Sequence, residues 1–184
     1  MIIWSILSII STTGIFLCYA VALFCYFSSD GKISWQLKTI SILSALNFII
    51  FVFFVFTRAM DTLVAVLGIG IQMSSASLFA WAIKTTYRRR LSIAYNPESG
   101  PFRLVRHLFY TSYLLFWLSL VVMQPSIVSA SVAFALFGFY LNAAKFEEAK
   151  FARSALASAC NGYAAQTGMF VPRMSLRMSL PISK

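Results

Sequence analysis

Long apolar segments separated by short polar ones dominate the chain. The segments run from Ile2 to Phe27, Thr39 to Phe56, Thr62 to Ile83, about His107 to Met123, and Ile127 to Leu141. An α-helix rises about 1.5 Å per residue, so it needs about 20 apolar residues to cross a hydrocarbon core of about 30 Å. The pattern therefore predicts an all-α integral membrane protein with about five transmembrane helices.

The fourth and fifth segments are shorter than the others and are joined by only Gln124, Pro125 and Ser126. A proline in so short a polar connection indicates a tight reversal. We therefore expect these two segments to form a helical hairpin that is partly buried against the other helices.

The composition agrees with a membrane protein, because 60% of the residues are hydrophobic, 11% are charged, and the mean hydropathy is +0.81. Soluble domains have about 25% charged residues. We expect a single membrane domain over residues 1–184. It comprises three N-terminal helices (1–83), a polar connector (84–106), the hairpin (107–141), and a C-terminal segment with a tail (142–184).

The first apolar segment is too long for a signal peptide and has neither a basic start nor a small-residue cleavage site, so we expect it to be retained. Arg58 is the only one of the fifteen Lys and Arg residues in the loop after the second segment, and Asp61 balances it. The others fall on one side of a five-helix topology, which the positive-inside rule assigns to the cytoplasm. The N-terminus is then expected outside and the C-terminus inside.

The net charge of +10 raises the question of nucleic-acid binding. These charges flank membrane segments instead of forming a soluble basic domain, so topology and anionic lipid headgroups explain them better. Cys18, Cys25 and Cys160 lack the paired spacing of a metal site or a disulfide framework. One histidine excludes a bis-histidine haem within one chain. We expect no nucleic-acid partner and no metal.

Two polar regions remain beside the apolar segments. The first is "KTTYRRRLSIAYNPESGPFRLVR", in which the three consecutive arginines are expected to end the third helix. The second begins "NAAKFEEAKFARSALASAC", whose composition favours a helix that continues the fifth segment or lies along the interface. Gly162 and then Thr167-Gly168 are expected to break that helix, and residues 174–184 have the composition of a loose tail.

Polar side chains that could bind a ligand or take part in catalysis gather at one expected membrane face. They precede or open the fourth segment, follow the fifth, and recur in the tail: Arg106, His107, Tyr110, Glu147, Glu148, Tyr163 and Arg173. The hairpin would bring His107 and Glu147 to the same face, where they could share a pocket. Each residue also has a simpler interpretation, as an interface anchor, a member of an aromatic belt or part of a solvated helix face.

The order of these residues adds information. "GPFRLVRHLFYTSYLLFW", a hydrophobic hairpin, "KFEEAKF", a tyrosine and then "MFVPR" follow one another between Gly100 and Arg173. This arrangement resembles the isoprenylcysteine carboxyl methyltransferase family of membrane enzymes and, more loosely, the phospholipid methyltransferases. Two positions depart from the family pattern. Leu108 stands where the family has proline, and Cys160 stands where many relatives have a second tyrosine.

The resemblance implies S-adenosylmethionine bound at the cytoplasmic face, in a pocket closed by the C-terminal segment, and a lipophilic acceptor that enters from the bilayer. Glu147 or Glu148 would bind polar groups of the cofactor, and Arg173 would be the basic residue beside the acceptor. By the same resemblance, cofactor contacts would come from Arg106, His107, the backbone around Val105 and Leu108, Tyr110 and Tyr163. No glycine-rich nucleotide loop is expected in such a fold, and the sequence has none.

The chemistry leaves three alternatives. Methyl transfer to a carboxylate needs alignment and removal of water but no proton abstraction. Arg173 or Arg106 could hold that carboxylate through two parallel hydrogen bonds. Methylation of a lipid amine would instead need a base, for which Glu147 or Glu148 is available. The third alternative is a non-catalytic scaffold or transport subunit that keeps the fold, although the first three segments offer almost no intramembrane charge for a transport path.

Overall fold

The computed structural model describes residues 2–27, 35–90, 100–153 and 157–173, and this part of the chain is all-helical apart from one isolated β-bridge. The predicted helical fold is thus confirmed. The elements are α1 (Ile2–Phe27), α2 (Trp35–Thr57), α3 (Thr62–Arg90), the short 3-10 helix η1 (Gly100–Arg103), α4 (Leu108–Met123), α5 (Ile127–Ala152) and α6 (Ala157–Gln166).

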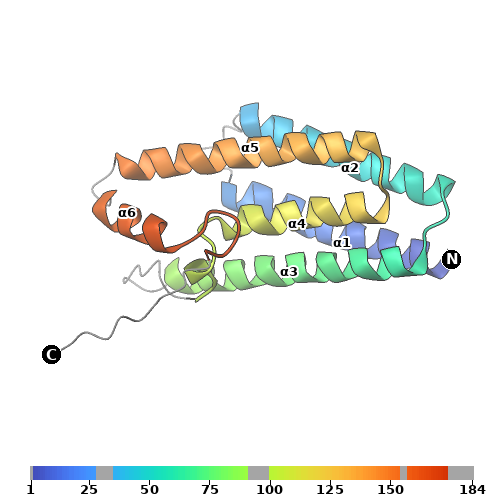
Figure 1. Cartoon of the computed structure of the whole chain (residues 1–184), viewed down its shortest axis with the longest axis horizontal. Helices are drawn as coiled ribbons and strands as arrows, with labels where there is room; N and C mark the ends of the chain where they lie inside the picture. The colour runs from blue at the N-terminus through green and yellow to red at the C-terminus, as the bar shows by residue number, and fades with distance from the viewer. Residues whose placement is uncertain (1, 28–34, 91–99, 154–156, 174–184) are drawn as a thin grey trace.

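The five long helices lie side by side and run alternately in opposite directions (Figure 1). α6 lies across the end of the bundle at which α4 begins and α5 ends. The described chain therefore starts at one end of the bundle and finishes at the other, and we call the end that carries α6 the α6 end.

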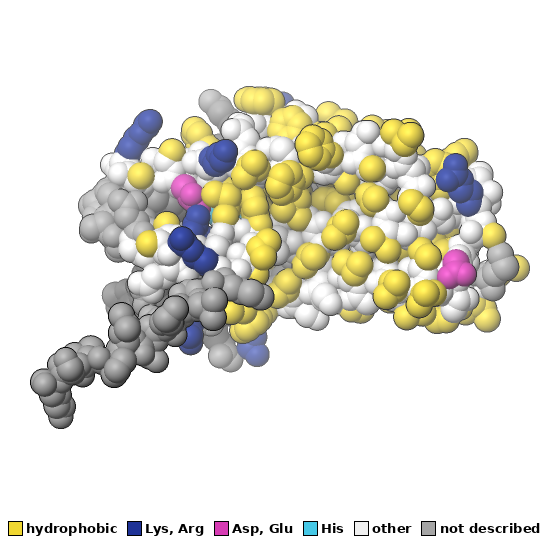
Figure 2. All heavy atoms as spheres, in the orientation of Figure 1, with side chains coloured by type: hydrophobic (Ala, Val, Ile, Leu, Met, Phe, Trp, Pro, Cys, Tyr) yellow, Lys and Arg dark blue, Asp and Glu magenta, His cyan; other side chains and the backbone are white. Residues whose placement is uncertain are grey.

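Four helices contain a span long and apolar enough to cross a membrane, namely Ile2–Ala22, Trp35–Thr57, Thr62–Thr86 and Ile127–Lys150. α4 is apolar but has only 16 residues. Figure 2 shows hydrophobic side chains over the middle of the bundle and charged side chains towards its two ends. The protein is an integral membrane protein, and its described residues include four long apolar helices and a fifth, shorter one.

α4 is the central helix of the bundle. Leu118 is its only exposed residue, and it packs most extensively against α3. A helix that is apolar on all sides is typical of a position surrounded by other helices. This burial explains why α4 can be only 16 residues long. It is surrounded by side chains of the other helices and has little surface that would face lipid. The expected reversal at Gln124-Pro125-Ser126 is confirmed, and α5 packs back on α4.

Small and polar residues at alternating spacings of three and four give α3 one buried face. A Cβ added to Gly68 would overlap the side chain of Met123 on α4, so the glycine allows close approach of the two helices. The other fully buried positions on this face carry small or polar side chains: Ala65, Gln72, Ser75 and Ala82. The small residues of "GIGIQMSSAS" therefore allow α3 to pack closely against α4.

Hydrogen bonds between uncharged side chains join α1 to α3 inside the bundle. Ser11 Oγ donates to Gln72 Oε1 at 2.8 Å, and Gln72 Nε2 donates to Thr12 Oγ1 at 2.7 Å. Farther along, the Tyr19 hydroxyl and Ser75 Oγ are 2.5 Å apart, and Ser75 Oγ donates to the carbonyl oxygen of Ser112 at 2.6 Å. Buried polar groups need such partners, and these bonds fix α1, α3 and α4 relative to one another.

Several boundaries differ from the sequence-based expectation. α2 begins at Trp35 instead of Thr39, and α3 continues beyond Ile83, the end of its apolar segment. α3 ends at Arg90, which confirms that the arginine cluster terminates this helix. α5 continues to Ala152, as the composition after Asn142 predicted. The expected break at Gly162 is wrong, because α6 runs through it, whereas the break at Thr167-Gly168 is confirmed. The expected loose tail and the side chain of Cys160 lie outside the described residues.

Candidate active site

A sharp turn precedes α4 and positions the residues at its start. Gly100 has a φ of 71°, which favours glycine, and it opens η1 beside the buried Pro101. Leu108 is 2% exposed and packs with Val105 and Ala82. The turn at Gly100-Pro101 therefore supplies the break before α4, and Leu108, which replaces the proline of the resembled family, fills an apolar contact.

The segment after α6 runs alongside the connector to α4. Val105 and Gly168 form a parallel β-bridge, the Arg106 amide donates to the Gly168 carbonyl at 2.9 Å, and the His107 amide donates to the Met169 carbonyl at 3.1 Å. Thr111 Oγ1 donates to the Phe170 carbonyl at 3.2 Å. The C-terminal segment thus closes over the beginning of α4.

Arg106 holds this closing segment through its side chain. Its Nε donates to Glu148 Oε1 at 3.0 Å, and its Nη1 donates to the carbonyl oxygens of Ala164, at 2.8 Å, and Thr167. Carbonyl groups at the end of a helix have no intrahelical partner, and Arg106 satisfies two of them at the end of α6. The guanidinium therefore joins the start of α4 to α5 and α6.

His107 lies between two carboxylates. Its Nε2 is 3.0 Å from Glu148 Oε1, and its Nδ1 is 3.6 Å from Glu147 Oε2. The Tyr110 hydroxyl donates to Glu147 Oε1 at 2.5 Å, and the His107 and Tyr110 rings stack with centroids 5.6 Å apart. The expectation that His107 and Glu147 share one end of the bundle agrees with these distances. We call Arg106, His107, Tyr110, Glu147 and Glu148 the polar cluster.

Exposure differs strongly within the polar cluster. The side chains of His107 and Arg106 are 11% and 15% exposed, whereas those of Glu148 and Glu147 are 34% and 42% exposed. A carboxylate has about four acceptor positions on its two oxygens. Glu147 therefore combines fixed orientation by Tyr110 with room for a further hydrogen-bond donor.

The two remaining predicted residues lie at the edge of this site. The Tyr163 hydroxyl donates to the Phe102 carbonyl at 2.6 Å and so connects α6 to η1. Arg173 is exposed, and its Nη1 donates to the Ala165 carbonyl at 2.5 Å. Arg173 thus projects from the closing segment, and this side-chain hydrogen bond reaches α6 instead of the polar cluster.

Sequence reasoning missed Gly168, Thr111 and Phe170 as residues of this site. A Cβ on Gly168 would overlap the Val171 carbonyl oxygen, so only glycine allows the turn that brings the closing segment to Arg106. The Phe170 ring lies 6.0 Å from the His107 ring, centroid to centroid. The "TG" pair in the sequence predicts a helix break, and a glycine can also mark such a close backbone approach.

Comparison with family models, curated proteins and solved structures gave no significant match to the chain. The assignment of a function therefore depends on the geometry of the polar cluster and on the motif resemblance described above.

Proposed function

We propose that this chain is a membrane methyltransferase that uses S-adenosylmethionine and methylates a lipophilic acceptor, with a carboxylate as the acceptor group ahead of an amine. One observation carries the proposal: two partly exposed carboxylates, a histidine and a tyrosine from α4 and α5 meet beneath the segment that follows α6. They meet at the α6 end, where polar residues give way to the apolar surface of the bundle. A polar cofactor and a membrane-dissolved acceptor can both reach such a position.

The chemistry of the donor set fits the proposed cofactor. S-adenosylmethionine has an ammonium group and ribose hydroxyls, for which the Glu147 carboxylate is a suitable acceptor. It also has a cationic sulfonium, which favours contact with aromatic ring faces such as those of Tyr110 and Phe170. Arg106 is bonded to Glu148 and to two carbonyl oxygens, so we assign it to holding the closing segment instead of the cofactor.

The cofactor would supply an electrophilic methyl group, and a carboxylate acceptor would need no proton removed. The chain has three tasks in this proposal. Glu147, oriented by Tyr110, binds the polar groups of the cofactor. Arg106 and Glu148 keep the closing segment in place and so exclude water from the site. Arg173 has donors beyond the one bonded to Ala165 and binds the acceptor carboxylate.

An amine acceptor would change the role of one residue. An ammonium must lose a proton before it attacks, and Glu147 Oε2 is the position that would accept it. Arg173 would then have no partner on the acceptor. Acceptor kinetics of Arg173→Ala distinguish the two chemistries, because a higher KM for the acceptor is expected only for a carboxylate.

Calorimetric titration of S-adenosylmethionine into the detergent-solubilised full chain tests the proposal directly. Wild type is expected to bind, Glu147→Gln to bind about tenfold more weakly because a charge-assisted hydrogen bond is lost, and His107→Ala to lose binding. Lys150→Gln is the matched control, since Lys150 is an exposed residue on the same helix and outside the polar cluster. Its affinity is expected to stay within about twofold of wild type.

A non-catalytic scaffold remains the second candidate, and one observation favours it. Arg106 and His107 form hydrogen bonds to neighbouring groups of the chain itself, so the polar cluster also holds the C-terminal segment against the start of α4. If helical, monodisperse wild-type protein binds no S-adenosylmethionine, the methyltransferase proposal is wrong. The function of the polar cluster is then to hold the C-terminal segment in place.

A further inference from the structure

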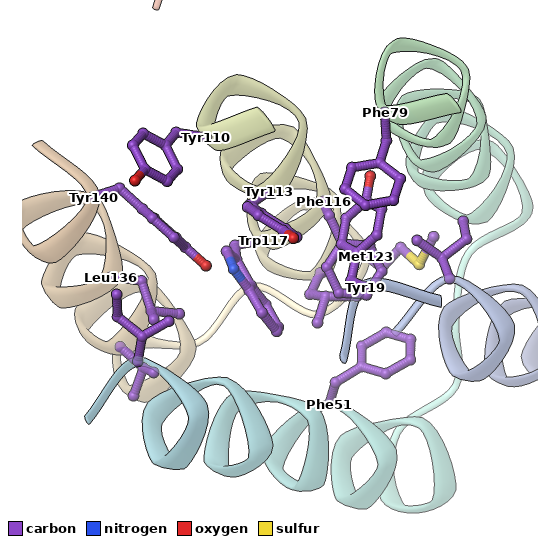
Figure 3. Packing of buried hydrophobic residues seen from close by; sticks show 14 of the residues in the cluster. Tyr19, Phe51, Phe79, Tyr110, Tyr113, Phe116, Trp117, Met123, Leu136 and Tyr140 are labelled. Carbon is purple, nitrogen blue, oxygen red and sulfur yellow. The ribbon is translucent and has the colours of Figure 1, made fainter. Parts of the chain in front are cut away.

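A cavity of about 210 Å³ lies inside the bundle, and no residue of the polar cluster lines it, although Tyr140 on its wall packs against Tyr110 with ring centroids 5.5 Å apart. α1, α2, α4 and α5 all contribute to its wall, and each lining residue is uncharged. Figure 3 shows the aromatic side chains of this region, which include Tyr19, Tyr113, Trp117 and Tyr140. The cavity is therefore mostly apolar, with a few polar atoms from tyrosine, tryptophan and serine.

Two of these polar atoms have no hydrogen-bond partner. Tyr113 and Trp117 are each 3% exposed, and neither the Tyr113 hydroxyl nor the Trp117 Nε1 is hydrogen-bonded within the described chain. The Tyr140 hydroxyl points towards the Trp117 indole nitrogen and interacts with it and with Ser44 (Figure 3), but the indole N–H does not reach hydrogen-bond geometry. A buried donor without a partner costs about 1–3 kcal/mol.

The remaining polar groups nearby are satisfied. The Tyr19 hydroxyl is bonded to Ser75, and Ser41 Oγ donates to the Leu37 carbonyl at 2.9 Å. The two unpaired atoms are therefore specific to one wall of the cavity, which α4 supplies. They are one helical turn apart, at positions i and i+4, so they project from the same face of α4.

The chemistry of these two atoms restricts what can occupy the cavity. An indole N–H is a donor only, and a phenol hydroxyl can donate, so both suit an oxygen that accepts hydrogen bonds. The lining has no cation to neutralise a carboxylate, and burying an unpaired charge is costly. A neutral carbonyl oxygen therefore fits better than an acid.

The size and position of the cavity restrict its occupant further. Binding pockets for whole drug-sized molecules measure about 300–1,000 Å³, so this cavity fits only the polar end of a longer molecule. Phe16, Ala20 and Ser41 on its wall are half-buried, so the cavity approaches the lipid-facing surface between α1 and α2. The remaining chain of the molecule can lie in the bilayer.

We propose that this cavity binds the carbonyl-bearing end of a neutral membrane lipid, with the Tyr113 hydroxyl and the Trp117 indole N–H as hydrogen-bond donors. The proposal concerns binding alone and does not depend on methyl transfer. Its failure is thus separate from failure of the proposed enzyme activity.

Photocrosslinking tests this proposal on the full chain in lipid nanodiscs. The probe is a long-chain methyl ketone with a diazirine in its tail, and the comparison probe is the hydrocarbon of the same length with the same diazirine. The ketone is expected to label peptides of α1, α2, α4 and α5 saturably, and excess unlabelled ketone is expected to compete. The hydrocarbon is expected to label lipid-facing residues without saturation.

Four variants make the result specific. Tyr113→Phe and Trp117→Phe are each expected to weaken the apparent Kd of the ketone about twofold to tenfold, the effect of one hydrogen bond. Ala20→Trp fills the cavity and is expected to abolish saturable labelling. Ala45→Trp adds the same side chain to an exposed position of α2 and is expected to preserve it.

Two results would overturn the proposal. One is equal, unsaturable labelling by both probes in wild type. The other is an unchanged Kd in both Tyr113→Phe and Trp117→Phe, which would mean that water alone satisfies the two donors. Tyr113→Phe removes a single oxygen, and Trp117→Phe removes the indole nitrogen with two ring carbons, so these smaller changes keep the test valid if Ala20→Trp does not fold.

Discussion

Two groups of polar residues within one bundle differ in what they can do. Between α1 and α3, Ser11, Thr12 and Gln72 are uncharged and bond to one another. At the α6 end, His107 and Glu147 belong to a charged cluster with partly exposed carboxylates. The first group contributes to helix packing, whereas the second retains acceptor positions for a ligand.

The difference follows from the surroundings of each group. An ionised side chain in the hydrocarbon region is costly, so the interior uses hydroxyls and an amide that satisfy one another. At the α6 end, water can solvate the exposed parts of Glu147 and Glu148, and Arg106 balances the charge of Glu148. Charge is thus found where a polar ligand would arrive, and substitutions in the two groups are expected to have different effects.

Gly168→Ala is expected to have the largest effect, since its Cβ would overlap the backbone of Val171 and displace the closing segment. We expect a loss of about 4 kcal/mol in the docking of residues 157–173, the range of severe backbone strain. Hydrogen exchange followed by mass spectrometry measures it as loss of amide protection in α6, with α1 to α5 unchanged.

Gly162→Ala is the matched control for that substitution. A Cβ at Gly162 meets nothing within 4 Å, and alanine favours a helix over glycine by about 1 kcal/mol. Protection of α6 is therefore expected to stay equal or rise. Loss of protection in both variants would contradict the role assigned to the Gly168 turn.

Arg106→Gln is expected to have the next largest effect. It removes an ion pair and two charge-assisted bonds to carbonyl oxygens, and we expect docking of the closing segment to weaken by about 3 kcal/mol. Amide protection in α6 would then fall about 100-fold. Arg153→Gln is the control, because Arg153 is exposed just after α5. Equal amide protection of α6 in the two variants would contradict the role of Arg106 in holding the closing segment.

Much of this fold follows from the hydrophobic pattern. Each apolar run forms a helix, and the proline-containing reversal after Met123 brings α4 and α5 together. The start of α2 was placed too late because Trp35 to Lys38 combine apolar and polar residues, as is common where a helix leaves the membrane. The predicted break at Gly162 is absent because one glycine lowers the stability of a helix by only about 1 kcal/mol. Contacts such as the hydrogen bond from Tyr163 to the Phe102 carbonyl can offset that loss.

Less of the candidate site could be predicted from the sequence. The meeting of His107 and Glu147 follows from the hairpin, because both lie near its open end. The pairing of Val105 with Gly168 gives no such signal, since it joins backbone groups far apart in the sequence and needs no side-chain pattern. The donors of Tyr113 and Trp117 were also missed, because their type fits an aromatic belt and only packing shows that both are buried without a partner.

Gln72→Leu is expected to have the smallest effect. The amide of Gln72 bonds to Ser11 and Thr12, but hydrogen bonds between membrane helices contribute only about 0.6 kcal/mol on average and about 1.7 at most. Thermal melting in detergent is expected to show a small loss of stability, and S-adenosylmethionine affinity is expected to be unchanged. Gly68→Leu, which overlaps Met123 on the same face of α3, is the comparison with a larger expected loss. A large drop in cofactor affinity with Gln72→Leu would show that the interior network acts on the α6 end, and the two polar groups would then be one coupled system.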